Sequence, residues 1–337
     1  MATLKQRDSG WWQAVIRRKG QPVQSQTFEK KADAETWARD IESKMDRGVF
    51  TDRSEAEATT LYAALERYEK EVSIHKDGHS QEKKRIDKWR CDPLSTRSLA
   101  SLRSTDFAKW QDKRLKEVSP STVQKDLAVI SHLFTTSFKK WGLPVVNPIT
   151  AVDVAKEDNS RSRRLEGDEE VRIINELKPI RGRSIWMRPL VLLAIETAAR
   201  QSELLGMKWV DVDFTKSVAR IRGKDRADGK SRTKNGDKFR DVPLSSKAIS
   251  ILAEMPRSIG GSVFPISAPV VMSAFKAAVD RADIKDLRFH DLRHEATSRL
   301  ADKLQMHELM KVTGHSSTRM LARYYHPRAE DLAKKLG

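Results

Sequence analysis

A polar segment near the middle of the chain divides it into two parts, each with its own hydrophobic pattern. Residues 156–164 read Lys-Glu-Asp-Asn-Ser-Arg-Ser-Arg-Arg, and their side chains follow no helical or strand period. Such a charged, aperiodic stretch is typical of a linker between domains, which we place at 156–165. The chain has 337 residues, enough for two or three domains with ordinary cores.

The overall charge favours a polyanionic partner. The chain carries 64 Lys and Arg against 47 Asp and Glu, a formal net charge of +17. Phosphates that such residues neutralise release their counterions, so nucleic acid is the expected partner. No apolar stretch approaches the roughly 18 residues of a spanning helix, and no signal peptide opens the chain. We therefore expect a cytoplasmic protein, associated with DNA in the nucleoid and with no membrane partner.

Cysteine usage limits the classes of structural site. Cys91 is the only cysteine, so the chain has no intrachain disulfide and no cysteine-rich zinc site. A reducing compartment fits this composition.

Residues 1–57 predict a small β-sheet followed by a helix. One strand-like run covers 11–17 and a second ends at Phe28, and a turn containing Gly and Pro lies between them. Residues 32–48 then place Ala, Trp, Ile and Met at helical spacing, with Gly48 as the stop.

Charge separates these two pieces of the first domain. Residues 1–31 hold seven Lys and Arg against two Asp and Glu, whereas residues 32–58 hold four against eight. A basic sheet backed by a helix resembles the arm-binding domain of integrases, which implies that the sheet binds DNA, with Arg17, Arg18 and Lys19 among the expected contacts. The alternative is a small α/β module whose basic face is only solvated.

Residues 58–155 predict a helical bundle. A long helix is expected to start at Ser119 and Pro120 and to end near Gly142. Apolar residues at helical spacing form three stripes, which we interpret as core and not as a base-stacking surface: Leu61, Leu65, Tyr68 and Val72; Phe107, Trp110 and Leu115; Val123, Leu127, Ile130, Leu133 and Phe134.

Residues 166–337 predict a mixed α/β domain, so the whole chain is expected to be mainly α with small β-sheets. A helical stretch over 184–206 precedes strand-like runs at 218–222 and 239–243, and four or five helices follow. The 13 residues after Tyr324 are expected to form a helical tail that docks on a neighbouring protomer or packs on its own domain.

Six side chains suited to phosphate chemistry lie in a fixed order along this last part. Each stands in a short motif: Arg200 in Thr197-Ala-Ala-Arg-Gln-Ser-Glu203, Lys234 in Thr233-Lys-Asn-Gly, His290 and Arg293 in His290-Asp-Leu-Arg-His294, His315 in Thr313-Gly-His-Ser, and Tyr324 nine residues later. No single motif is specific, but the ordered set resembles the tyrosine recombinase (phage integrase) family. The resemblance implies an arm-binding domain over 1–57, a core-binding domain over 58–155 and a catalytic domain over 166–337.

The residue types fit the cleavage of a phosphodiester. Attack builds negative charge on oxygens that already repel a nucleophile, so the site must supply cations, a nucleophile and a proton. Arg200 and Arg293 are suited to forked hydrogen bonds to the non-bridging oxygens, and His315 would add a donor. Glu203 lies close enough to hold the Arg200 guanidinium.

The resemblance assigns the remaining roles. Tyr324 is the expected nucleophile, which would form a 3′-phosphotyrosine while a 5′ hydroxyl leaves. Lys234 would protonate that oxygen, and His290 would assist proton transfer at the tyrosine. The family's route passes through a Holliday junction with no cofactor, ATP or metal. It implies a homotetramer on two DNA duplexes and leaves room for an accessory DNA-bending protein.

Several alternatives stay open at this level. Lys230 competes with Lys234, and Tyr325 competes with Tyr324. His290 and Arg293 would also suit the exposed face of an amphipathic helix. The linker arginines are expected to follow the DNA backbone: Arg161, Arg163 and Arg164.

Two further motifs are rejected. Gly223 and Gly229 are separated by five residues, where a phosphate-binding loop has four. His290 and His294 stand four apart like two zinc ligands, but Asp291 occupies the place of the expected glutamate.

The expected reaction is site-specific recombination, for integration and excision of a mobile element or for DNA inversion. A non-catalytic DNA-binding regulator on the same fold and a topoisomerase-like relaxing enzyme are the rival hypotheses.

Overall fold

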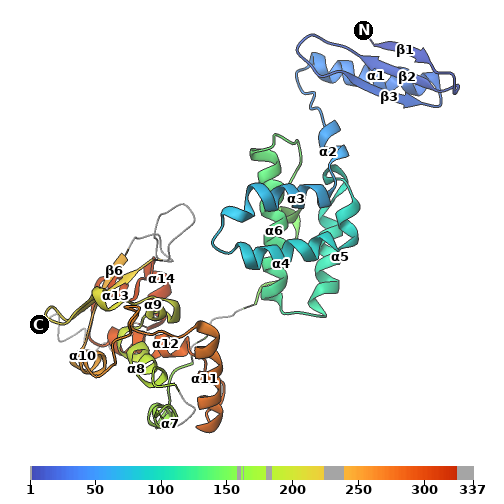
Figure 1. The fold of residues 1–337 in the computed structure, drawn as a ribbon. Helices are drawn as coiled ribbons and strands as arrows, with labels where there is room; N and C mark the ends of the chain where they lie inside the picture. Colours follow the sequence, from blue (N-terminus) through green and yellow to red (C-terminus); the bar gives the residue numbers. More distant parts are fainter. Residues whose placement is uncertain (1, 158–160, 162, 180–183, 224–238, 325–337) are drawn as a thin grey trace, which may run out of the picture. The chain divides into compact units, whose positions relative to one another are not determined.

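The computed structural model describes residues 2–157, 161, 163–179, 184–223 and 239–324. The chain forms two compact units, residues 1–159 and residues 160–337, each of which has its own fold (Figure 1). The prediction of a mainly α chain with small β-sheets is confirmed. None of the described helices is long and apolar enough to cross a membrane.

The first unit begins with a three-stranded antiparallel sheet covered by one helix. Its elements are β1 (Thr3–Gln6), β2 (Trp12–Ile16), β3 (Gln24–Phe28) and α1 (Lys31–Asp46). Helix α1 lies along one face of the sheet, as Figure 1 shows, and packs against β2 and β3. Ala14, Ile16 and Ala38 form part of the small core between sheet and helix. The opposite face carries the register partners Lys5, Gln13 and Thr27.

A helical bundle completes the first unit. Its helices are α2 (Ser54–Ala58), α3 (Leu61–Glu71), α4 (His79–Arg90), α5 (Ser104–Leu115) and α6 (Pro120–Lys139), with the short 3₁₀ turns η1 (Ser73–His75), η2 (Pro93–Thr96), η3 (Leu99–Ser101) and η4 (Pro148–Ala151). The three predicted stripes pack into one hydrophobic cluster, which confirms their assignment as core. Ala56 also belongs to this cluster, so α2 groups with the bundle and not with the sheet.

The second unit is a helical domain with a small sheet at one side. Its strands are β4 (Val212–Asp213), β5 (Val218–Arg222) and β6 (Phe239–Pro243), in antiparallel order β4-β5-β6. Its helices are α7 (Glu169–Glu176), α8 (Met187–Thr197), α9 (Gln201–Leu205), α10 (Ser246–Ala253), α11 (Ala268–Arg281), α12 (Asp291–Ala301), α13 (Met306–Thr313) and α14 (Thr318–Leu321), with 3₁₀ turns η5 (Trp209–Asp211) and η6 (Ala322–Tyr324).

The predicted helical stretch over 184–206 is interrupted between two helices, and the reason matters for the site. Helix α8 ends at Thr197 because Ala198 adopts a left-handed conformation with φ of 52°. The chain then turns and restarts as α9, with Arg200 in extended conformation at its N-cap. Alanine carries no sequence signal for such a break, and the left-handed region costs a non-glycine residue energy.

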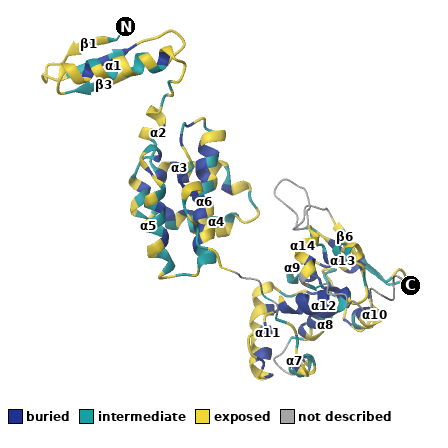
Figure 2. Cartoon of the chain, turned by 180° about the vertical axis from the view of Figure 1, so that it is seen from behind, coloured by how far each residue is buried: buried dark blue, intermediate teal, exposed yellow. Residues whose placement is uncertain are grey.

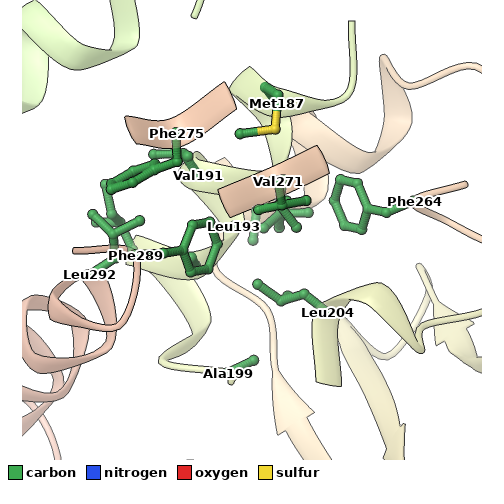
Figure 3. Close-up of a cluster of buried hydrophobic side chains, with 14 of the residues drawn as sticks. Met187, Val191, Leu193, Ala199, Leu204, Phe264, Val271, Phe275, Phe289 and Leu292 are labelled. Atoms are coloured by element: carbon green, nitrogen blue, oxygen red, sulfur yellow. The ribbon is translucent and has the colours of Figure 1, made fainter. Parts of the chain in front are cut away.

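The core of the second unit holds the segments on which the site is built. Figure 3 shows Ala199, Leu204 and Leu292 in the same cluster as Phe275 and Phe289. Ala199 precedes Arg200, and Leu292 precedes Arg293, so buried neighbours anchor both arginines. Helix α12 packs against α8, and both appear among the most buried helices in Figure 2.

Candidate active site

Arg200 is held by a carboxylate from its own helix. The Glu203 Oε2 atom accepts the Arg200 backbone N–H at 2.7 Å, and Glu203 Oε1 accepts Arg200 Nη1 at 2.8 Å. Arg200 Nη2 also donates to the Gly314 carbonyl at 3.4 Å. The predicted role of Glu203 as the support of Arg200 matches this geometry. The Arg200 side chain remains 18% exposed, so it is accessible to a ligand.

Arg240 holds the same carboxylate and was missed by the sequence reasoning. Its Nη2 donates to Glu203 Oε2 at 2.6 Å, and its Nη1 donates to the Val312 carbonyl. Burial would raise the pKa of Glu203, but the charge of Arg240 and the bonds from Arg200 outweigh it and hold that pKa below its ordinary range. Glu203 is therefore an anion shared by two guanidiniums.

The sequence did contain a signal for Arg240. It alternates with the exposed Phe239 and Asp241 on β6 and shares the inward face with buried Val242. An arginine on the inward face of a strand needs a buried partner. Gly314 fits against it: with φ of 66° and a Cβ position 3.1 Å from the Arg240 side chain, this residue has two reasons to be glycine.

Arg293 joins two segments that are distant in the sequence. Its Nη1 donates to the Ala198 carbonyl at 2.5 Å, and its Nη2 donates to the Thr313 carbonyl at 2.6 Å. Ala198 stands just before Arg200, and Thr313 stands just before His315. One buried side chain from α12 thus fixes the two backbone turns that present the other phosphate-binding candidates.

The charge of Arg293 is costly where it lies. The side chain is 5% exposed, and burial first, with the nearby charge of Arg200 second, lowers the pKa of Arg293 to about 9. Two guanidiniums that repel each other favour an arriving anion.

His315 is oriented by the hydroxyl of Thr313. Thr313 Oγ1 donates to the Leu309 carbonyl at 2.6 Å and also contacts His315 Nδ1 at 2.6 Å. A hydroxyl has one proton, so Nδ1 must be the donor in the second bond. His315 Nε2 then faces Arg293 Nη2 at 3.4 Å. A phosphate oxygen placed at Nε2 would be bound best by the doubly protonated ring.

Tyr324 lies beside His294 and His315. Its phenol oxygen hydrogen-bonds to His294 Nδ1, and its ring centroid lies 6.4 Å from that of His315. The segment is anchored by the fully buried Leu321, and the Tyr324 ring packs on the cluster that contains Leu309.

His290 contacts the other histidine of its motif. It is exposed at the N-cap of α12. Its ring is nearly perpendicular to the His294 ring, with centroids 5.2 Å apart and planes at 85°. His294 is the histidine that contacts the phenol. The sequence reasoning considered His294 only as a metal ligand. In the part of the chain that the structure describes, no group of three His, Cys, Asp or Glu could hold a metal ion.

The linker arginines are paired with carboxylates of the second unit. Arg161 makes two bonds to the fully buried Asp291, at 2.7 and 2.8 Å, and a third at 2.7 Å to Asp286. Arg164 bonds Glu295 at 3.0 Å. Asp291 and Glu295 are both on α12, so these contacts tie the end of the linker to the helix that carries Arg293.

The third linker arginine, Arg163, binds the first helix of the second unit. Arg163 donates to Glu169 on α7 at 2.6 Å. The predicted DNA-binding role of the three arginines has no direct test in the structure, but their guanidiniums already have acidic partners.

The other predicted residues are described in part. Arg18 pairs with Asp46 of α1, while Arg17 and Lys19 are exposed at the end of β2 and in the turn after it. Lys234 and its alternative Lys230 lie outside the described residues, as do Tyr325 and the C-terminal tail.

Comparison with known proteins gives matches over most of the chain. The model of the Phage integrase family matches residues 163–331. A shufflon-specific DNA recombinase of Escherichia coli is 37% identical over 287 residues, which cover 82% of this chain and 71% of that protein.

Two solved structures share the fold at low identity. The Tn1549 transposon integrase in complex with a circular intermediate DNA has a TM-score of 0.66 and 17% identity, covering 82% of this chain and 98% of that one. A lambda integrase tetramer bound to a Holliday junction has a TM-score of 0.64 and 19% identity, covering 97% of this chain and 95% of that one.

Proposed function

The chain belongs to the phage integrase family and is a site-specific DNA recombinase, and from this premise we propose that Tyr324 cuts its target by attack on the scissile phosphate. The phenol oxygen forms a bond to phosphorus, the 5′ oxygen leaves, and the strand stays joined to the enzyme through its 3′ phosphate. This linkage conserves the energy needed to rejoin DNA. The position of Tyr324 beside Arg293 and His315 of its own chain supports cleavage in cis.

Three cationic or polar groups stabilise the transition state in this proposal. Arg200 and Arg293 bind the non-bridging oxygens, and His315 donates a further hydrogen bond from Nε2. The observation that carries the proposal is the pair of hydrogen bonds that Arg293 donates to the carbonyls of Ala198 and Thr313. That contact is what brings the segments of Arg200 and His315 to one place.

Lys234 supplies the proton for the leaving 5′ oxygen in this proposal. Its place in Thr233-Lys-Asn-Gly, between strands β5 and β6, supports the assignment. Arg240, on the second of these strands, contacts Glu203, so the strand that follows Lys234 is tied to the Arg200 helix.

We assign the remaining parts of the molecule to DNA binding and assembly. The sheet-and-helix domain over 1–57 binds DNA through the sheet face that carries Lys5 and Gln13, with Arg17, Arg18 and Lys19 at its edge. The bundle, predicted over 58–155 and joined in the structure by α2 (Ser54–Ala58), binds the core site, and 156–165 links it to the catalytic domain over 166–337. Four protomers act on two duplexes, with an accessory DNA-bending protein where the sites are far apart.

DNA inversion is the favoured outcome of recombination. The identity of 37% to a shufflon-specific recombinase supports this choice over integration. The test is a plasmid with two copies of a candidate site, taken from DNA beside the gene, in inverted or direct orientation. We expect inversion in the first plasmid and excision in the second, and neither with Tyr324→Phe.

Two results would overturn the assignment. Tight, sequence-specific binding without rearrangement of either plasmid would indicate a DNA-binding regulator. Relaxation of any supercoiled plasmid, with or without the sites, would indicate a topoisomerase.

A further inference from the structure

The phenol of Tyr324 meets a histidine that the six-residue set does not include. His294 Nδ1 hydrogen-bonds to the Tyr324 hydroxyl, and the two rings lie nearly parallel, with planes at 25° and centroids 5.7 Å apart. His294 is only 7% exposed, so its side of this part-buried contact is shielded from solvent. The residue directly follows Arg293 on α12.

Either atom of this contact can be the donor, and the phenol donates when His294 Nδ1 carries no proton. An imidazole nitrogen that accepts a hydrogen bond from a phenol is placed to take its proton when the oxygen becomes a nucleophile. His290 occupies the outer position, with its ring edge-on to His294 at 5.2 Å and its side chain exposed. The ring next to the reacting oxygen is therefore His294.

Positive charges lie close to this pair. Burial has the largest effect on the pKa of Arg293 and lowers it to about 9, and a negative charge on Tyr324 acts in the opposite direction. This effect is smaller than those of Arg200, Glu203 and Arg240, and it means that Arg293 and a phenolate attract each other. Arg200 adds positive charge near Arg293, and Glu203 is already shared by Arg200 and Arg240.

We propose that His294 is a further catalytic residue that accepts the phenol proton of Tyr324 during strand cleavage. The inference rests on the proposed function, because it assumes that Tyr324 is the nucleophile.

Proton transfer between Tyr324 and His294 accompanies the exchange of bonds at phosphorus in both directions of the reaction. During cleavage the phenol O–H bond breaks, its proton moves to His294 Nδ1, the tyrosine oxygen bonds to phosphorus, and the P–O5′ bond breaks. The 5′ oxygen takes its proton from the general acid, proposed as Lys234. During rejoining the 5′ hydroxyl attacks, and His294 returns its proton to the departing tyrosine oxygen.

The experiment measures single-turnover formation of the covalent adduct on a nicked duplex. His294→Asn keeps an oxygen near the position of Nδ1 that can accept a hydrogen bond but cannot take a proton under these conditions. His294→Ala removes the contact altogether. We expect both variants to bind DNA as the unsubstituted protein does and to form adduct on the order of 10²-fold more slowly, the usual contribution of a general base.

A more acidic phenol separates proton transfer from structure. Tyr324 is replaced by a fluorinated tyrosine that is largely ionised near neutral pH, and the ratio of rates with and without His294→Asn is measured again. We expect the ratio to fall to within several-fold, because an ionised phenol needs no base. Arg200→Ala is the matched control, and its defect should not shrink, since Arg200 acts on the phosphate.

Each outcome has a defined meaning. An equal defect with both tyrosines would show that His294 is only structural and would overturn the inference. Unchanged or faster cleavage by His294→Asn and His294→Ala would show that the contact belongs to the resting protein alone, with the same consequence. No adduct from the unsubstituted protein on its cognate site would instead remove the proposed function, and the inference with it.

Discussion

Arg293 shows how much of the active site depends on contacts of one side chain with backbone. Its two bonds to the Ala198 and Thr313 carbonyls are made by the same guanidinium that is proposed to bind phosphate. Lysine could not replace it, because an ammonium lacks the planar fork that reaches both carbonyls.

Thr313 is the residue whose hydroxyl we expect to control His315. Thr313→Val removes the acceptor for His315 Nδ1 while keeping side-chain volume. We predict that adduct formation slows roughly fivefold, which corresponds to the loss of one hydrogen bond of about 1 kcal/mol. The measurement is single-turnover cleavage of a nicked duplex.

Thr297→Val is the control for this substitution. Thr297 is also buried, and its hydroxyl donates to the Arg293 carbonyl four residues earlier at 2.7 Å, as Thr313 does to Leu309. It is expected to have a small effect on the rate. Equal slowing by both variants would show that lost helix packing, and not the orientation of His315, is responsible.

At the level of elements, Arg240 connects three parts of the catalytic unit. Its partners are Glu203 on α9 and Val312 on α13, while its own backbone belongs to β6. The Arg240 and Glu203 side chains are both 9% exposed, so solvent screens their ion pair little.

Arg240→Ala should therefore destabilise the catalytic unit strongly. Removing one partner of a buried ion pair typically costs about 3 kcal/mol or more, and Glu203 would keep only Arg200. Denaturant unfolding measures the change. Arg220→Ala, which breaks the exposed pair with Asp241 on the neighbouring strand, should leave the midpoint nearly unchanged. Similar midpoints for the two variants would contradict the proposed role of Arg240.

The end of the linker gives a second test at this level. Arg161→Ala leaves the fully buried Asp291 without its two strongest bonds, so we expect faster hydrogen exchange in the first turn of α12 and a lower Tm. If Arg161 acted only on the DNA backbone, the variant would lose DNA affinity and keep its exchange pattern.

Sequence patterns predicted elements better than they predicted contacts. Period and capping residues located the strands around Phe28 and the helix that starts at Pro120. They missed the break at Ala198, because that turn is imposed by the bond from Arg293, ninety-five residues away in the chain. His294 and Arg240 were missed for the same reason, since each acquires its role from a partner distant in the sequence.

The candidate site divides in a similar way. Order and spacing located Arg200, Arg293, His315 and Tyr324, which the structure brings together. The same order predicted that His290 assists proton transfer at the tyrosine, and it did not predict the contact of His294 with the phenol. Motif spacing records which residues occur and cannot record which of two histidines on one helix turn faces the phenol.

At the scale of the whole molecule, the sheet-and-helix domain has a hydrophobic core separate from that of the bundle. Deletion of residues 1–50 should therefore leave the rest folded and able to cut a nicked core site. DNA affinity measured against salt should show a shallower slope, because fewer phosphates are neutralised. An unchanged slope would exclude the first domain from DNA binding.

The central claim is that Tyr324 becomes joined to a 3′ phosphate of the target. The most direct test is to trap the adduct on a nicked duplex carrying the recombination site, digest it, and identify the modified peptide and the DNA end by mass spectrometry. The account predicts a 3′-phosphoryl group on Tyr324 and no adduct with Tyr324→Phe. A modification on Tyr325, or a linkage to a 5′ phosphate, would contradict it.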